Sequence, residues 1–401
     1  MPVDSSTIDG LLKKVYTPKE IENLQNMETA TLSKIKKSPK KPAGQGFVFP
    51  VNLKKKKKGQ GSQNELEALR TSGSQTPVQG TILPKVFTHT IRYSGLSLAI
   101  AKGNEESFAD NATFQVEEGF KDSSKELNAQ LFRDGSGLLA LVNGAVSASA
   151  TVTFDNGVPT HFREGMELDF FNGATKEVSA AEVSSINISS SQIVLSSAVT
   201  LTDNDEIYRA GVNDNAPTDG KEWAGLPLVT DDGSLLTTYE GISRSTYPKW
   251  DGISIAQSGA NISNDKLQQA ISRVKVTSGK KPKKIISNTS QFRKYLDVVT
   301  PMKTFNDSNK MDSGYVAVPT WNGMEWIEDT DCAFDTIYMI DPDYFELFEV
   351  TPLQLSEEDG KVFKWDNGYD AYVSYIKSYA NSGSTCPNAH VAITGLATPT
   401  F

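Results

Sequence analysis

The feature that most constrains this chain is residues 44–137, where a lysine-rich excursion returns through an extended segment and leads directly into a long amphipathic helix pattern. The outward half reads GFVFPVNL (46–53), the tip is polar to position 80, and the return half reads TILPKVFTHTIRYSGLSLAI (81–100). Both flanks are rich in strand-forming residues. A two-stranded ribbon alone is marginal in water, so an excursion this long needs a second surface to lie on. We expect that surface to belong to a neighbouring molecule.

The residues expected to contact the neighbour lie in the tip and on its outward flank. They are Phe47, Phe49, Lys54, Lys55, Lys56, Lys57 and Lys58. A block of like charges can equally be a solvated loop without a partner, so the sequence leaves both interpretations of the lysine run open.

Charge is distributed unevenly along the chain. Residues 1–60 hold thirteen lysines against five acidic residues, a net charge of +8, while the whole chain carries −9 and the remainder therefore −17. A basic arm beside an acidic body suits contact with acidic protein surface or a polyanion, and we favour the protein surface. No signal-peptide pattern, disulfide framework or apolar run of membrane-spanning length occurs. We therefore expect synthesis in the cytoplasm and no membrane partner.

Two helices are expected in the first third. Thr17-Pro18 followed by Glu20 forms a capping box, which predicts a helix over residues 17–35. Its apolar stripe is narrow, so we interpret it as an arm that another surface covers. Residues 104–133 show apolar side chains at three- and four-residue steps and end at RDGSG, which predicts a helix about 45 Å long that other elements pack along.

The remainder alternates between β and α/β patterns. Residues 146–212 contain short alternating strands with turn dipeptides at Asn156-Gly157 and Asn172-Gly173, which predicts a small inserted β-barrel or sandwich carried as a decoration. Helices near 263–277 and 289–299 flank a buried strand at 283–288. The last third returns to strands, with a hairpin turn at Asn322-Gly323.

No residue pattern indicates catalysis strongly. His89, His161 and His390 are far apart in sequence and lack a partner at metal or catalytic spacing, so structural roles are expected. Acidic runs at 203–206 and 213–215 lack complete calcium-loop spacing. We expect no enzyme, no cofactor and no metal.

One acidic cluster gives the best argument for an enzyme. Two tryptophans stand beside four acids there: Trp321, Trp326, Glu325, Glu328, Asp329 and Asp331. Such a set could supply the paired carboxylates of a glycosidase. Acids beside a hairpin turn are usually solvated instead, and we favour that interpretation.

The linear order of these features resembles the major capsid proteins of tailed bacteriophages with the HK97-type fold. The resemblance is carried by FPVNLKKKKK (49–58) with its return strand, by AQLFRDGSGLLA (129–140), and by PTWNGMEWIEDTD (319–331), DTIYMIDPDYFELFEV (335–350) and NAHVAITGLA (388–397) in that order. It implies an α+β fold with an N-terminal arm, an extended loop, a long spine helix, an axial α/β domain and an inserted small all-β domain.

The resemblance implies seven segments. They are an arm (1–43), an extended loop (44–98), a peripheral domain with the spine helix (99–145), the inserted barrel or sandwich (146–212), a connecting loop (213–240), an axial domain (241–312) and a β-rich return (313–401). The extended loop is expected to lie over an adjacent subunit.

The function implied by the resemblance is that of a major capsid protein, which self-assembles into the icosahedral head shell around packaged viral double-stranded DNA. Expected partners are further copies of the chain in hexamers and pentamers, a separate scaffolding protein, a portal and a decoration protein, with non-specific proximity to DNA. The expected location is the virion, after assembly in the host cytoplasm. The alternatives are a tail or baseplate protein, suggested by the β content, and a glycan-binding or glycan-hydrolysing protein, suggested by the tryptophan and acid cluster.

Overall fold

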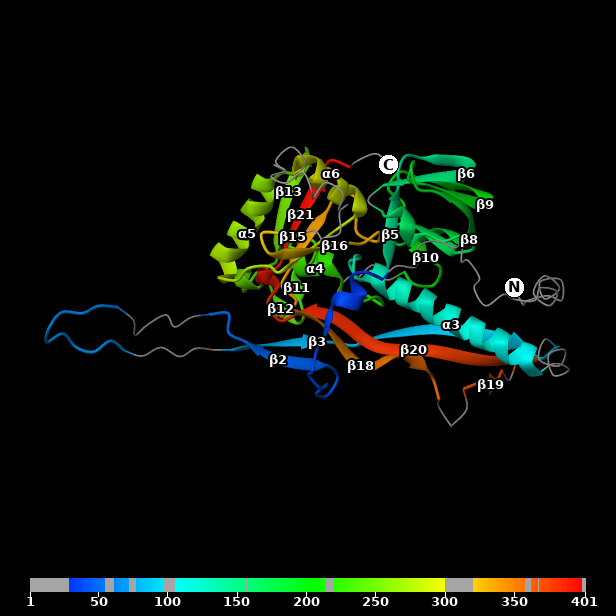
Figure 1. Ribbon diagram of the computed structural model, residues 1–401, viewed down its shortest axis with the longest axis horizontal. Helices are drawn as coiled ribbons and strands as arrows, with labels where there is room; N and C mark the ends of the chain where they lie inside the picture. Colours follow the sequence, from blue (N-terminus) through cyan, green and yellow to red (C-terminus); the bar gives the residue numbers. More distant parts are fainter. Residues whose placement is uncertain are drawn as a thin grey trace, which may run out of the picture.

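The computed structural model describes residues 29–54, 61–71, 77–96, 105–155, 157–213, 220–299, 320–357, 362–366 and 368–398. Figure 1 shows four parts: an elongated sheet with a long helix along it, an α/β unit, a closed barrel, and a ribbon that projects from the body. The predicted mixture of helices and strands is confirmed.

The elongated sheet is antiparallel apart from one short edge strand. Its central strand β20 (Ala371–Ser384) pairs with β4 (Lys85–Ser94) on one side, and with β18 (Phe345–Leu355) and β19 (Lys364–Trp365) on the other. Helix α3 (Glu105–Gln130) lies along this sheet (Figure 1). Its twenty-six residues correspond to a length of about 39 Å at 1.5 Å per residue.

The predicted spine helix is confirmed as far as Gln130, while residues 131–133 form a turn instead of continuing the helix. Gly119, a weak helix former, is explained by packing. A Cβ at this position would lie 3.0 Å from Ile376 Cδ1 and 3.2 Å from Ile91 Cδ1, both on the sheet. The glycine therefore lets the helix approach the sheet closely.

The α/β unit contains a six-stranded mixed sheet and two helices. In spatial order its strands are β13 (Ile253–Ala260), β21 (Val391–Leu396), β17 (Ile337–Ile340), β14 (Lys284–Ser287), β16 (Met324–Glu328) and β15 (Thr320–Trp321). Helices α5 (Asn264–Ser278) and α6 (Thr289–Val299) match the predicted positions. Ser263 caps α5 by accepting from the Lys266 backbone N–H, and Gly279 ends it in the left-handed region.

The inserted unit is a closed six-stranded barrel, one of the two architectures that the sequence predicted. In barrel order its strands are β10 (Glu206–Arg209), β5 (Leu138–Val142), β6 (Val146–Asp155), β9 (Gln192–Leu201), β8 (Thr175–Asn187) and β7 (Glu167–Asn172). It has its own apolar core, and a 3-10 turn, η2 (Pro159–His161), joins β6 to β7.

Two sequence expectations about the barrel are corrected. Its first strand is Leu138–Val142, so the boundary placed at residue 146 was too late; the RDGSG helix stop leads straight into the barrel. The hairpin at Asn172-Gly173 is present, because β7 and β8 pair across it. The hairpin expected at Asn156-Gly157 is absent, since β6 pairs with β5 and β9 and not with β7; Asn156 itself lies outside the described residues.

The ribbon and the arm lie beside the elongated sheet. The ribbon consists of β2 (Phe47–Val51) and β3 (Val78–Ile82), paired antiparallel. In the arm, a 3-10 turn, η1 (Leu32–Lys34), precedes β1 (Lys36–Lys37), which pairs parallel with β18. The helix expected over residues 17–35 is therefore wrong for residues 29–35, because side chains of the body bind the amides there, as described below; residues 17–28 lie outside the described part of the chain.

A central core joins the ribbon, the spine helix, the elongated sheet and the α/β unit. It lies around α4 (Leu226–Thr230), the hairpin of β11 (Thr238–Tyr239) and β12 (Ile242–Ser243), and two 3-10 turns, η3 (Pro248–Trp250) and η7 (Pro387–Ala389). Its largest fully buried side chains include Trp223, Trp250, Tyr239 and Phe47. None of the helices within the described ranges has the length and apolar character needed to cross a membrane.

Candidate assembly site

The tip of the ribbon lies far from the rest of the chain. Residues 61–71 are all exposed and stand away from the body in Figure 1. Their hydrogen bonds are local, such as Arg70 Nη2 to the Ser62 carbonyl at 2.8 Å. Leu66 is fully exposed and Leu69 is 87% exposed. Two large apolar side chains therefore lie in water at the end of the projecting loop.

Phe47 and Phe49 do not belong to that surface. Their side chains are 0% and 4% exposed and enter the central core of the same chain. The Phe47 ring lies 5.3 Å from Phe348, and the Phe49 ring lies 6.2 Å from Trp250. The expectation that they contact a neighbour is wrong, because the alternation along β2 turns both rings inward. They anchor the base of the ribbon instead.

The lysine run begins with a contact inside the chain. Lys54 Nζ lies 4.5 Å from the centroid of the Tyr247 ring, which is a cation–π contact. Lys55, Lys56, Lys57 and Lys58 lie outside the described residues, so their contact with a neighbour stays a prediction.

Lysines of the arm lie against acidic residues of the body. Lys34 Nζ is 2.6 Å from Glu325, Lys37 Nζ is 2.8 Å from Glu349, and a longer contact of 3.9 Å joins Lys36 to Asp343. The preference for acidic protein surface is confirmed for these three lysines, within one chain. These surface pairs are screened by water, so they contribute little to stability.

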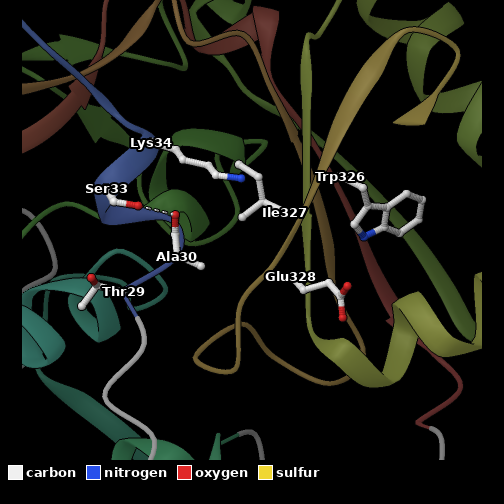
Figure 2. Close-up of a pocket in the computed structure, with 7 residues that line it drawn as sticks. All are labelled: Thr29, Ala30, Ser33, Lys34, Trp326, Ile327 and Glu328. Atoms are coloured by element: carbon white, nitrogen blue, oxygen red, sulfur yellow. Dashed lines mark hydrogen bonds between the residues drawn. The ribbon is translucent and has the colours of Figure 1, made fainter. Parts of the chain in front are cut away.

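An open hollow of 440 Å³ separates the arm from β16 (Figure 2). It is lined by Thr29, Ala30, Ser33, Lys34, Trp326, Ile327 and Glu328. Lys34 extends across it toward Ile327, while the side chains of Trp326 and Glu328 point away from the arm (Figure 2).

The glycosidase alternative needs two carboxylates that converge, and Glu325 and Glu328 do not. Glu325 and Glu328 are three residues apart on one strand, so they lie on opposite faces of the sheet. The hydrogen bond from Lys34 lowers the pKa of Glu325. Because their side chains do not converge, Glu325 and Glu328 do not form the carboxylate pair of a glycosidase.

The other two acids of the cluster form a buried polar junction. Asp329 and Asp331 are 1% and 0% exposed, so the expectation that they are solvated is also wrong. Asn128 Nδ2, on α3, donates to Asp331 Oδ2 at 2.7 Å and to both carboxylate oxygens of Asp329 at 3.1 and 3.2 Å. Lys125 Nζ lies 2.9 Å from Asp331. Burial, and then the charge of Asp331, raises the pKa of Asp329.

This junction also binds the arm and the barrel. The Thr31 backbone N–H donates to Asp329 at 3.0 Å, and the Leu32 N–H donates to Asn128 Oδ1 at 3.0 Å. From the barrel, Thr160 Oγ1 donates to the Thr330 carbonyl at 3.0 Å. The bonds to Thr31 and Leu32 replace those of a helix, which explains why the arm is not helical at this point.

A second buried cluster lies where the barrel meets the end of the spine helix. Arg133 donates to Glu126 at 2.8 Å and to Glu222 at 2.9 Å, and all three side chains are buried. Arg209 of β10 lies 3.4 Å from Glu126. Burial alone raises the pKa of Glu126, but Arg133 and then Arg209 outweigh it and lower that pKa to about 2. The buried charges thus lie at the end of the spine, and the barrel reaches them through Arg209, whose side chain is 42% exposed.

Two histidines have structural partners, as the sequence predicted. His161 Nε2 lies 3.0 Å from the Asp331 carbonyl oxygen, and burial lowers its pKa to about 3. His390 Nδ1 accepts from the Asp341 N–H, its Nε2 lies 2.9 Å from Ser384 Oγ, and burial lowers its pKa to about 3. Both imidazoles are therefore neutral at pH 7. His89 lies on β4, and partial burial lowers its pKa.

Among the residues that the structure describes, no three His, Cys, Asp or Glu side chains gather as metal ligands do. The acids at 203–206 hold turns instead: Asp203 accepts from the Gly144 N–H at 2.7 Å, and Asp205 accepts from the Thr202 N–H at 2.6 Å. Of the run at 213–215, only Asn213 is described.

The chain is similar to known proteins in structure but not in sequence. No family model and no curated protein matches the sequence. Among solved structures, the capsid asymmetric unit of cyanophage A-1(L) is similar with a TM-score of 0.59 at 10% sequence identity, and the match covers 98% of this chain and 100% of that one. The chain has the HK97-type capsid fold.

Weaker similarities extend to other structures. One is of Gordonia phage Cozz, with a TM-score of 0.49, 12% identity and coverage of 98% and 93%. Another is the encapsulin complex of Synechococcus elongatus, with a TM-score of 0.45, 8% identity and coverage of 99% and 96%. In this chain the described elements of the arm, the ribbon, the long helix, the barrel and the α/β unit follow the order that the sequence predicted. Sequence reasoning missed the buried junction at Asn128, because no periodicity marks a polar helix residue as buried.

Proposed function

We propose that this chain is a major capsid protein, whose copies form the icosahedral shell around double-stranded DNA of a tailed phage. The observation that carries the proposal is the projecting ribbon. Its base is fixed in the core by Phe47 and Phe49, while Leu66 and Leu69 at its tip are exposed within the described part of the chain. An extension with an apolar end suits contact with another copy.

The proposed segment roles follow the resemblance. Residues 44–98 are the extended loop over the adjacent subunit, and α3 is the spine of the peripheral domain. The α/β unit is the axial domain around which hexamers and pentamers form. The contact is heterologous, loop tip to body, and such contacts close into rings when the rotation allows it. Repetition at every subunit lets interfaces of modest strength hold a shell together.

The charge distribution supports a wall that does not hold the genome tightly. The body beyond residue 60 carries −17, and three arm lysines are already paired with acids of the same chain. A scaffolding protein, a portal and a decoration protein are the further partners we propose, with assembly in the host cytoplasm and the virion as destination. The tail alternative is disfavoured by α3, since a tail-tube protein is not expected to contain such a spine.

Electron microscopy of the purified chain, and of lysate in which it is made with its assembly partners, tests the proposal. We expect shells, tubes or capsomers in negative stain. A chain that stays monomeric under every condition, with its partners present, would refute it.

A double variant tests the loop tip itself. Leu66→Asn with Leu69→Ser removes the exposed apolar side chains, and asparagine suits the left-handed backbone at position 66, where φ is 67°. Assembly should fail while the free energy of unfolding of the monomer changes by less than about 0.5 kcal/mol. The matched control is Val276→Ser on α5, which is also 87% exposed and should assemble normally. Normal assembly of the double variant would show that the tip has no partner.

A further inference from the structure

A buried carboxyl group lies where the ribbon joins the body. Glu240 occupies the two-residue turn between β11 and β12, and its backbone carbonyl accepts from the Thr81 N–H of β3 at 2.9 Å. The residue as a whole is half-buried, but its carboxyl group points inward. Oε1 accepts from the Ser384 N–H at 2.9 Å, and Oε2 is buried with no hydrogen-bond partner. One side chain thus joins the base of the ribbon to the end of β20.

The turn is unfavourable for a glutamate. Glu240 has a φ of 50° and Gly241 a φ of 78°, so both central residues of the turn are left-handed. Glycine, asparagine and aspartate are the usual residues at such positions. A longer acidic side chain held there, and turned into the protein, indicates that its interior contacts hold it in place.

Its surroundings leave little room for a charge to be solvated. A Cβ at Gly383 would lie 2.6 Å from Glu240 Oε1 and 2.7 Å from Ile82 Cδ1, so both side chains press on that glycine. The Tyr239 hydroxyl hydrogen-bonds the carboxyl group, which favours its charged form less than burial disfavours it, and the charged groups that face it are Arg244 and Lys40. His390 is one step further away, through the Ser384 hydroxyl. Arg244 is bound to Asp231, and Lys40 lies over the Phe49 ring at 5.1 Å.

We propose that Glu240 is a proton-controlled latch for the base of the projecting ribbon. The protonated carboxyl stays in its pocket and keeps the turn against Thr81, Ile82 and the end of β20. Loss of the proton leaves a carboxylate with one unpartnered oxygen, and the outward path at the exposed turn lets it reach water. Movement of the turn then releases the Thr81 amide and loosens the ribbon.

The direction in which the opening equilibrium changes with pH follows from the proton affinities of the closed and open states. Burial raises the pKa of Glu240 from its usual 4.5 to about 8 in the closed state, while the carboxyl in the open state has its ordinary pKa. The closed state therefore binds the proton more tightly, and opening becomes more favourable as pH rises between these values. The opening equilibrium should increase about tenfold per pH unit from pH 5 to 8 and level off above that.

Hydrogen–deuterium exchange of the full-length, unassembled chain tests the latch. After correction for the intrinsic pH dependence of exchange, protection of the Thr81 and Ile82 amides should fall about tenfold per pH unit between pH 5 and 8. Amides of α5 in the same samples are the internal control and should show no such trend. In Glu240→Gln, which keeps the size and cannot ionise, protection at Thr81 should be independent of pH. Glu349→Gln on β18 is the matched control and should behave like the unchanged chain.

Two results would overturn the proposal. One is constant protection at Thr81 across this range in the unchanged chain, a result that does not depend on whether the Gln variant folds. The other is an equal pH dependence in the unchanged chain and in Glu240→Gln. The measurement needs no assembled particle, so its outcome is separate from that of the shell hypothesis.

Discussion

Replacing Asn128 with alanine should cost far more stability than its position on a helix suggests. The side chain is fully buried and donates to two buried carboxylates, while its oxygen accepts from the Leu32 amide. Hydrogen bonds to charged groups contribute roughly 1.5–3 kcal/mol each, and breaking a buried charged network costs about 3–5 kcal/mol. We therefore expect Asn128→Ala to lose about 3–5 kcal/mol, roughly two to four orders of magnitude in the folding equilibrium.

Urea unfolding of the unassembled chain measures this loss, by linear extrapolation of the free energy of unfolding. Exchange of the Thr31 and Leu32 amides should rise in the same variant, since their acceptors are Asp329 and Asn128. The control is Asn388→Ala, which removes a surface hydrogen bond of 3.0 Å to the Lys249 carbonyl and the acceptor of the Cys386 thiol, a weak donor, and should cost about 1 kcal/mol. Equal losses in the two variants would show that the junction does not hold the arm to the spine.

Two further predictions concern pH and salt. His161 and His390 have pKa values depressed to about 3, so each should remove roughly 1.4 kcal/mol of stability per pH unit as pH falls below 6.5. Glu240 instead adds stability as pH falls from 8 to 4.5, because burial raises its pKa in the folded state to about 8. Urea midpoints should therefore fall more steeply on acidification in Glu240→Gln than in the unchanged chain, and parallel slopes would contradict this. Replacing all five lysines of the run at 54–58 with serine should weaken assembly more at low than at high salt, measured by light scattering; equal assembly at low salt would mean that the run is only solvated.

The correct predictions from sequence rest on local patterns. The steps of apolar residues marked α3, and the helix predicted near residues 263–277 is α5. The Asn322-Gly323 turn joins β15 to β16 as a two-residue hairpin. Each of these signals is contained in a few neighbouring residues, because backbone geometry and capping depend on close neighbours.

The errors arise where distant residues decide the outcome. The arm is not helical at Thr31 because an aspartate 298 positions away binds its amide. Asp329 and Asp331 followed a hairpin and were expected in water, but Asn128, some 200 positions earlier, lies against them. Phe47 was assigned to a neighbour, and Phe348 of the same chain covers it.

The sequence by itself determined the order of arm, loop, spine, barrel and α/β unit, and the separation of basic arm from acidic body. Periodicity, turn residues and charge are properties of the chain, and the HK97-type fold follows that order. Only the tertiary structure decided which polar residues are buried, which aromatic residues anchor the ribbon, and that Glu240 lies at its base. Burial and hydrogen bonding depend on which segments come into contact in the folded chain, and local sequence patterns do not specify those contacts.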